Sequence, residues 1–391
     1  MKKTLVGGVY YGLHNIGDEA ILSSIINAFR HDTEMTVMTQ DPTWVRGKFP
    51  EVNCREIKLH YTKPKMGLYV DPRKKVFSNY MRVRKEIEFY SGFDYYLCGG
   101  ATILSDCPWY SLRTVELADK AKVPTILWGV GMAEVTDNDT RKYIMSVLNR
   151  DYVKLIFTRD EKVLERLIGF GVEKDKLRVS YDPAIMIKGN AFPTEKYLTI
   201  EEDTILINGK MNIGVCLSGE ADVVAKTPIN VIATALQIIQ DKYDANLIFI
   251  PTGCGDHCKD TEILIDIAEK IENENVVVVN KEFDPDDLVE FLKKFEVVIS
   301  SRLHLNIFAA NANVPSLGLV RNLKIIDFAT LMRLPYLEFE NLEVDRLVET
   351  VNEIIVRKDD IKNLMLNIRD MMIEKNKNAV LEAISLIEKG K

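Results

Sequence analysis

Short apolar runs alternate with longer helical patterns along most of the chain, and this alternation limits the possible folds more than any other feature. Small residues such as Gly, Ser and Thr follow many of the runs. Strands that alternate with helices in this way form βαβ units with parallel sheets. The sequence therefore predicts an α/β fold whose strands lie near 4–9, 35–39, 94–97, 124–128, 155–158, 212–217, 247–250, 276–279, 297–299 and 316–320.

The length of the chain and one irregular segment divide it into two domains. At 391 residues the chain exceeds the ~250–300 residues at which a single core stops growing. Residues 187–210 break the alternation with Gly189, Pro193 and an acidic run. We therefore predict two doubly wound, Rossmann-like domains at 1–190 and 211–345, joined by a linker at 191–210. The helical tail, 346–391, has no strand pattern, and packing back on the first domain is one arrangement open to it.

Composition and charge exclude several classes of protein. The net charge of -7 argues against a general nucleic-acid binder, and no run approaches the ~18 apolar residues of a membrane span. Six cysteines in so long a chain do not form a disulfide framework. We therefore expect a cytoplasmic enzyme with reduced cysteines and no nucleic-acid partner.

One basic segment, 58–85, stands out in this acidic chain. It contains nine Lys or Arg residues and one acidic residue, Asp71, with tyrosines and a phenylalanine between them. Such a segment is either a solvated basic face or a patch that meets a lipid-linked diphosphate or an anionic membrane surface. Peripheral contact with the inner face of the membrane is the partner interaction that the second interpretation predicts.

The segment 7–22 combines a strand, a glycine-containing loop and the start of a helix. Its spacing does not match G-x-G-x-x-G, and Asp18 and Glu19 occupy the first helical turn, where a dinucleotide site needs an empty anion pocket. The two carboxylates have two interpretations. Either they bind sugar hydroxyls or act as a general base, or they complement the positive end of the helix dipole.

Two further predicted strands end in glycines, at Gly99-Gly100 and at 129–131. Glycine allows the backbone to approach a ligand closely, but a tight turn after a buried strand needs the same residue. These glycines are therefore weak candidates for a binding site on their own.

Cationic residues follow strands in both predicted domains. Arg159 comes directly after one strand, and Arg302 and His304 come after another, beside Ser300 and Ser301. We expect the two serines to cap the next helix, which would place Arg302 and His304 at exposed backbone N–H groups. Arginine suits bidentate recognition of carboxylate or phosphate. With Lys324 after the next strand, the pattern predicts an anion site in the second domain, although a single such arginine is often a surface ion pair.

The cluster Cys254-Gly255-Asp256-His257-Cys258 suggests zinc at first sight. It lacks a partner pair at the standard spacing. We therefore predict no metal, and a substrate contact is the preferred role for this loop.

Taken together, these motifs resemble the polysaccharide pyruvyl transferase family over about residues 4 to 330. The resemblance implies a fold similar to GT-B glycosyltransferases, with the acceptor on the first domain and phosphoenolpyruvate on the second, and it implies no cofactor. It assigns Arg159, Arg302, Leu303 and Lys324 to the donor. It assigns the acceptor to Asn15, Asp18, Glu19, Gly99 and Gly100.

The resemblance also implies a chemistry. His304 would protonate the methylene carbon of phosphoenolpyruvate, since an unperturbed imidazole titrates near neutral pH, and Asp18 would accept a proton from a sugar hydroxyl. The acceptor would be a glycan or a lipid-linked glycan precursor of a cell-surface polysaccharide. The alternatives are a nucleotide-sugar glycosyltransferase or epimerase of the same architecture, and a noncatalytic binding module.

Overall fold

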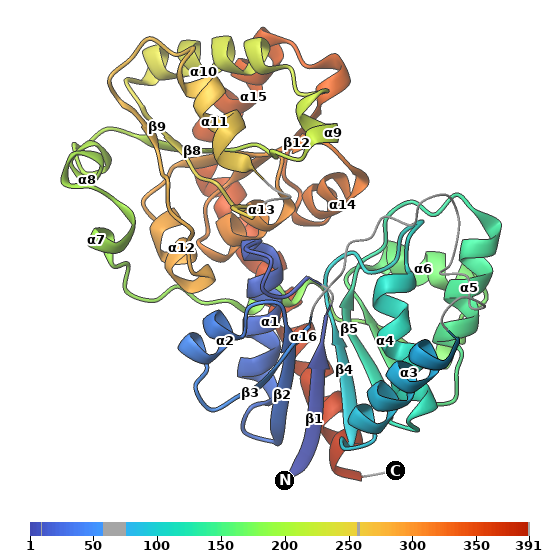
Figure 1. Cartoon of the computed structure of the whole chain (residues 1–391). Helices are drawn as coiled ribbons and strands as arrows, with labels where there is room; N and C mark the ends of the chain where they lie inside the picture. Colours follow the sequence, from blue (N-terminus) through green and yellow to red (C-terminus); the bar gives the residue numbers. More distant parts are fainter. Residues whose placement is uncertain (9, 58–75, 256–258, 390–391) are drawn as a thin grey trace. The chain divides into compact units, whose positions relative to one another are not determined.

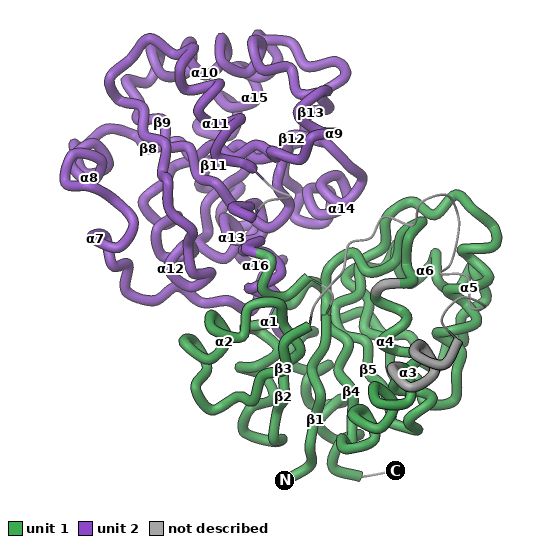
Figure 2. Tube along the Cα trace, in the orientation of Figure 1, with its two compact units in different colours: residues 1–13, 21–183, 375–391 green, residues 14–20, 184–374 purple. Residues whose placement is uncertain are grey.

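The computed structural model describes residues 1–8, 10–57, 76–255 and 259–389. The chain forms two compact units (Figure 2). Unit 1 comprises Met1–Leu13, Ile21–Pro183 and Lys375–Lys391, and unit 2 comprises His14–Ala20 and Ala184–Glu374. Each unit is built on one parallel sheet (Figure 1), so the predicted α/β fold with two doubly wound parts is confirmed.

Unit 1 contains a seven-stranded sheet with the order β3-β2-β1-β4-β5-β6-β7. Successive side chains of a strand face opposite sides of the sheet, and here Leu5 enters one hydrophobic core while Val6 enters the other. Because helices cover both faces, the central strands β4 and β5 are buried along their whole length rather than alternating between buried and exposed residues. The strands are β1 (Lys2–Gly7), β2 (Thr33–Thr39), β3 (Asn53–Glu56), β4 (Tyr95–Gly99), β5 (Thr125–Val130), β6 (Val153–Thr158) and β7 (Leu177–Val179).

The helices of unit 1 lie on the two faces of its sheet. One core contains apolar residues of α1 and of the end of α16, and the other contains residues of α4, α5 and α6. The last helix is tied to the sheet by the hydroxyl of Tyr95, which donates to the carbonyl of Leu386 at 2.7 Å. The helices are α1 (Ile16–Phe29), α2 (Pro42–Lys48), α3 (Val76–Tyr90), α4 (Trp109–Lys120), α5 (Asn138–Leu148), α6 (Glu161–Gly169) and α16 (Lys358–Lys389).

Unit 2 contains a six-stranded sheet with the order β10-β9-β8-β11-β12-β13. One face of this sheet packs against α10, α11 and α15, and α13 and α14 pack on the sheet through β11 and β12. The strands are β8 (Asn212–Cys216), β9 (Asn246–Phe249), β10 (Val276–Val278), β11 (Val297–Ser300), β12 (Ser316–Val320) and β13 (Tyr336–Glu338). The helices are α7 (Thr194–Tyr197), α8 (Ile200–Leu206), α9 (Ala221–Val224), α10 (Ile229–Tyr243), α11 (Asp260–Ala268), α12 (Pro285–Leu292), α13 (Leu303–Asn311), α14 (Leu323–Met332) and α15 (Val344–Val356).

The unit boundaries fall inside two helices. The first residues of α1 belong to unit 2 and the rest to unit 1, while α16 begins in unit 2 and ends in unit 1. The predicted linker, 191–210, lies in unit 2 and contains α7 and α8. No helix in the described part of the chain is long and apolar enough to cross a bilayer.

In each sheet the strand order reverses at one point. In unit 1, β2 and β3 lie on one side of β1, and the next strand of the chain, β4, lies on its other side. In unit 2, β9 and β10 lie on one side of β8, and β11 lies on its other side. Parallel α/β sheets bind their ligands outside the carboxyl ends of the strands at such a switch point. A ligand site is therefore expected at the loops that follow these strands.

Candidate functional site

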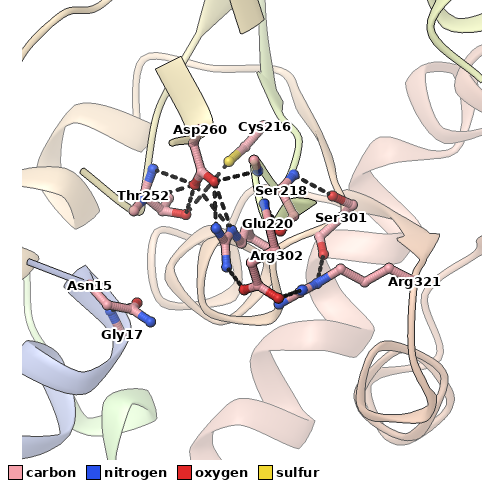
Figure 3. Close-up of polar contacts among 12 residues, drawn as sticks. Asn15, Gly17, Cys216, Ser218, Glu220, Thr252, Asp260, Ser301, Arg302 and Arg321 are labelled. Carbon is pink, nitrogen blue, oxygen red and sulfur yellow. Dashed lines mark hydrogen bonds and ion pairs between the residues drawn. The ribbon is translucent and has the colours of Figure 1, made fainter. Parts of the chain in front are cut away.

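Four charged side chains meet at the carboxyl edge of the unit 2 sheet (Figure 3). Glu220 follows β8, Asp260 begins the helix after β9, Arg302 follows β11 and Arg321 follows β12. These four strands are neighbours in the sheet, in the order β9-β8-β11-β12. The cluster therefore surrounds the switch point between β8 and β11.

Arg302 lies at the centre of this cluster and is 6% exposed. Its Nε donates to both carboxylate oxygens of Asp260, at 3.2 and 3.0 Å, and its Nη2 also pairs with that carboxylate. Its Nη1 donates to Oε1 of Glu220 at 2.6 Å. The guanidinium is thus held by two carboxylates from loops on either side of it.

Asp260 is fully buried and holds more than the arginine. Its Oδ1 accepts the N–H of Gly219 at 2.8 Å, and its Oδ2 accepts the N–H groups of Thr252 and Gly253 at 3.2 and 2.9 Å. The hydroxyl of Thr252 donates to the same oxygen at 3.1 Å. A buried carboxylate with this many donors fixes the loops after β8 and β9 in place, because each broken bond would leave a buried polar group unsatisfied.

Glu220 bridges two arginines. Its Oε2 accepts from Nη1 of Arg321 at 2.6 Å, while its Oε1 accepts from Arg302. Burial alone would raise the pKa of Glu220, but the guanidinium groups of Arg321 and Arg302 outweigh it and hold that pKa below its usual value. Glu220 is therefore ionised at neutral pH.

His304 lies next to the N-terminal segment 14–20. A Cβ atom on Gly17 would overlap the imidazole ring of His304, so only glycine fits there without displacing the ring. The contact joins two motifs that lie at opposite ends of the matched sequence. It places the predicted proton donor beside the first turn of α1.

The segment 14–20 is held in unit 2 by backbone contacts. The N–H of Ile16 donates to the carbonyl of Thr252 at 3.1 Å, and Asn15 forms an antiparallel bridge with Gly253. The side chain of His14 pairs with Glu282 at 3.0 Å. The loop that Asp260 fixes is thus the same loop that positions the start of α1.

The predicted acceptor residues of this segment have clear local roles. The carbonyl of Asn15 accepts the first hydrogen bonds of α1, and its Oδ1 accepts the N–H of Gly17 at 3.2 Å, so Asn15 caps the helix. Asp18 and Glu19 lie in the first turn of α1, where negative charge is favourable, and are 7% and 4% exposed.

The expectation that Ser300 and Ser301 cap α13 is wrong. Arg302 is the N-cap residue, and its side chain forms no capping hydrogen bond. The hydroxyl of Ser300 instead bonds to the backbone of Arg302, and the hydroxyl of Ser301 accepts the N–H of Ser218 at 2.9 Å. Leu303 is the first residue of α13, and Lys324, half-buried, is the second residue of α14.

Arg159 belongs to unit 1, where it lies with the glycine turn 129–131 and with Asp182 and Pro183. Its guanidinium lies against Gly131, since a Cβ on that glycine would be 2.8 Å from Cζ. Its Nη1 lies 3.8 Å from Oδ2 of Asp182, and both side chains are almost fully buried. Gly129, with a φ of +62°, leaves room for the ring of Pro183 in the same region.

Gly99 and Gly100 also belong to unit 1 and follow β4. A Cβ on Gly99 would meet the hydroxyl of Tyr11 and the side chain of Ile25, and one on Gly100 would meet Ile21. Gly100 has a φ of +40°, which also favours glycine. Both glycines therefore have a packing role, and only their backbone atoms are available for an acceptor.

Two predictions fall largely on residues whose structure is not described. Most of the basic segment 58–85 lies outside the described residues, as do Asp256, His257 and Cys258. Within the described ranges, no group of three or more His, Cys, Asp or Glu side chains is arranged to hold a metal ion.

The sequence model of the polysaccharide pyruvyl transferase family matches residues 15–322. The chain belongs to this family. The match starts at Asn15 and ends just after Arg321, so it contains every residue of the unit 2 cluster and Arg159. No curated protein sequence matches the chain significantly.

Solved structures of sugar-nucleotide enzymes share the fold of this pyruvyl transferase family member. A candidate UDP-N-acetylglucosamine 2-epimerase from Listeria monocytogenes has a TM-score of 0.68 at 14% identity, over 100% of this chain and 98% of that one. The epimerase from Neisseria meningitidis, bound to UDP-GlcNAc, has a TM-score of 0.62 at 15% identity, over 98% and 99%. Anabaena HepE, in complex with UDP-glucose, has a TM-score of 0.63 at 10% identity, over 100% of both chains. The fold is that of GT-B glycosyltransferases and epimerases, as predicted, and at these identities the likeness shows the fold alone.

Sequence reasoning missed two acidic members of the transferase cluster, Glu220 and Asp260. Each follows a predicted strand, and that position was the one available signal. The structure shows that both serve as partners of arginines.

Proposed function

We propose that this protein transfers the pyruvyl group of phosphoenolpyruvate to two hydroxyls of a glycan or its lipid-linked precursor, which forms a cyclic ketal and releases phosphate. The observation that supports it most is the placement of Arg302 and His304 at the switch point of the unit 2 sheet, in a chain that belongs to the pyruvyl transferase family. A buried, preorganised arginine can bind an anionic donor, and an imidazole can protonate it.

In this proposal the donor binds to unit 2. Arg302, Lys324 and the first backbone N–H groups of α13, including that of Leu303, attract its carboxylate and phosphate groups. The N-cap of α13 favours this role, because the side chain of Arg302 forms no capping hydrogen bond with those groups. We assign Arg159 of unit 1 to the donor as well, on the strength of its family motif.

The acceptor contacts are assigned to Asn15, Asp18 and Glu19, with backbone atoms of Gly99 and Gly100. Asp18 accepts the proton of the attacking hydroxyl. His304 protonates the methylene carbon, which makes C2 electrophilic. One hydroxyl oxygen attacks C2 and the second then displaces phosphate, so that two C–O bonds form at C2 while its bond to the phosphate oxygen breaks. The two hydroxyls lose two protons in all. One replaces the proton that His304 gave to the new methyl group, and the other passes through Asp18 to the phosphate that leaves.

The test measures phosphate release from phosphoenolpyruvate with a panel of glycan acceptors. We expect phosphate release to depend on the acceptor. His304→Ala and Arg302→Ala should each reduce that release by about 10²-fold or more. His31→Ala, which changes an exposed histidine outside the cluster, is the matched control and should retain activity. Mass spectrometry of the product should show the added pyruvyl group.

The opposite result is equally informative. Turnover of a nucleotide sugar with release of the nucleotide, and no phosphate release with any acceptor, would replace pyruvyl transfer by glycosyl transfer or epimerisation. Binding of phosphoenolpyruvate without turnover would indicate a noncatalytic binding protein.

A further inference from the structure

Glu220 bridges the two arginines Arg302 and Arg321 with its carboxylate. Its two carboxylate oxygens each accept a 2.6 Å hydrogen bond, one from Nη1 of Arg302 and the other from Nη1 of Arg321 (Figure 3). Two guanidinium groups that converge on one carboxylate form the arrangement that binds carboxylate or phosphate ligands. We propose that Glu220 is an internal occupant of an oxyanion site between Arg302 and Arg321, and that an oxyanion of the donor displaces it. This inference deepens the proposed function and rests on it for the identity of the ligand.

The two arginines have anchors other than Glu220. Arg302 is held by Asp260 through Nε and Nη2, and Arg321 donates from Nε to the carbonyl of Ser301 at 3.1 Å. Their side chains are 7% and 13% exposed, so packing restrains them as well. The pair of Nη1 donors therefore remains in place when Glu220 leaves.

Glu220 is the exchangeable carboxylate of the cluster. Its side chain is 32% exposed, whereas that of Asp260 is fully buried. Asp260 also accepts three backbone N–H groups, and its removal would break the loops after β8 and β9. Glu220 precedes the short helix α9 and forms no side-chain cap there. Rotation about its own side-chain bonds can carry its carboxylate toward solvent without moving the backbone.

The charges favour an exchange. With Glu220 in place, the two arginines are balanced by two carboxylates. When Glu220 swings out, a net positive charge remains at a largely buried position, which an incoming oxyanion neutralises. Attraction between charges is stronger at such a position than in bulk water.

The position of the site agrees with this role. Glu220 and Arg302 come from the loops on the two sides of the switch point between β8 and β11, where sheets of this kind bind ligands. His304, the proposed proton donor, is two residues beyond Arg302 on the same segment. One arginine of the oxyanion site and the acid that acts on the donor therefore belong to the same short segment.

The experiment measures anion binding by the full-length protein, with no acceptor present. Isothermal titration calorimetry with inorganic phosphate and with pyruvate tests the two anionic groups of the donor separately. An internal occupant that fills the site about nine-tenths of the time weakens apparent affinity about tenfold. We therefore expect Glu220→Gln and Glu220→Ala to bind phosphate, pyruvate or both about tenfold more tightly. The probe whose affinity increases shows whether the site takes the phosphate or the carboxylate of the donor.

Two further variants complete the test. Glu296→Gln removes a carboxylate of similar exposure in unit 2, one that pairs with Lys358, and should leave anion affinity unchanged. Arg321→Ala, which removes one arm of the site, should weaken binding of the same probe at least tenfold. Unchanged affinity in both Glu220 variants would show that the bridge is only structural and would overturn the proposal.

The readout separates this inference from the proposed function. Tighter anion binding in the Glu220 variants, together with no phosphate release from phosphoenolpyruvate, would support the site while rejecting pyruvyl transfer. Acceptor-dependent phosphate release with unchanged anion affinity in the variants would do the reverse.

Discussion

Gly17 lies so close to the imidazole of His304 that a methyl group at residue 17 would overlap the ring. The contact joins the first turn of α1 to the segment that carries the proposed proton donor. Because residue 17 has no side chain, the ring of His304 can lie directly against the helix. Gly17 is two residues from Asn15 and one from Asp18 in the chain.

The first prediction concerns this contact. Gly17→Ala should displace the ring of His304 and lower kcat/KM for phosphate release by about 10²-fold, since a shift of about 1 Å in a catalytic group has that effect. Gly47→Ala is the control, because no atom lies within 4 Å of a Cβ there. Wild-type kinetics in Gly17→Ala would show that the position of the ring is not critical.

The second prediction concerns Asp260 and stability. Asp260→Ala leaves the charge of Arg302 without its buried partner and several backbone N–H groups without an acceptor, so unfolding free energy should fall by about 3–5 kcal/mol. Chemical denaturation followed by circular dichroism measures this loss. Asp266→Asn, on the exposed side of the same helix α11, should change stability little. A loss of less than about 1 kcal/mol for Asp260→Ala would contradict the assigned role.

The third prediction concerns Arg159. Lysine keeps the charge but lacks the planar fork of arginine, so Arg159→Lys should raise the KM for phosphoenolpyruvate by about tenfold or more if the guanidinium binds the donor. Arg150→Lys changes an arginine of unit 1 that pairs with Glu116 and Asp119, and it should leave KM unchanged. Equal KM values for Arg159→Lys and the wild type would remove Arg159 from the donor site.

The fourth prediction concerns pH. Arg321 and Arg302 lower the pKa of Glu220 in the folded protein. A carboxyl whose pKa is lower in the folded state stabilises the fold above its unfolded pKa, and that contribution is lost as pH falls through the folded pKa. The wild type should therefore lose Tm faster than Glu220→Gln as pH falls from neutral to below the ordinary value of 4.5. Thermal melts at a series of pH values test this, with Glu349→Gln as an exposed control. Parallel Tm profiles for the wild type and Glu220→Gln would contradict the prediction.

Local patterns in the sequence were sufficient for the fold class and for the position of two candidate cations at strand ends. The apolar runs predicted every described strand except β3, β7 and β13, because buried parallel strands are apolar on both faces. A cation directly after a strand predicted the positions of Arg159 and Arg302, since the carboxyl ends of parallel strands share one edge of a sheet. Both inferences depend on properties of neighbouring residues, which the sequence displays directly.

The partners of these residues depended on the tertiary structure. Strand order is not chain order, so β8 lies beside β11, and Glu220 meets Arg302 although a long stretch of chain separates them. The sequence by itself indicated a positive site after β11. Only the fold showed that Asp260 and Glu220 balance that charge, and that Gly17 makes room for His304, because such contacts are formed by loops that the sheet brings together.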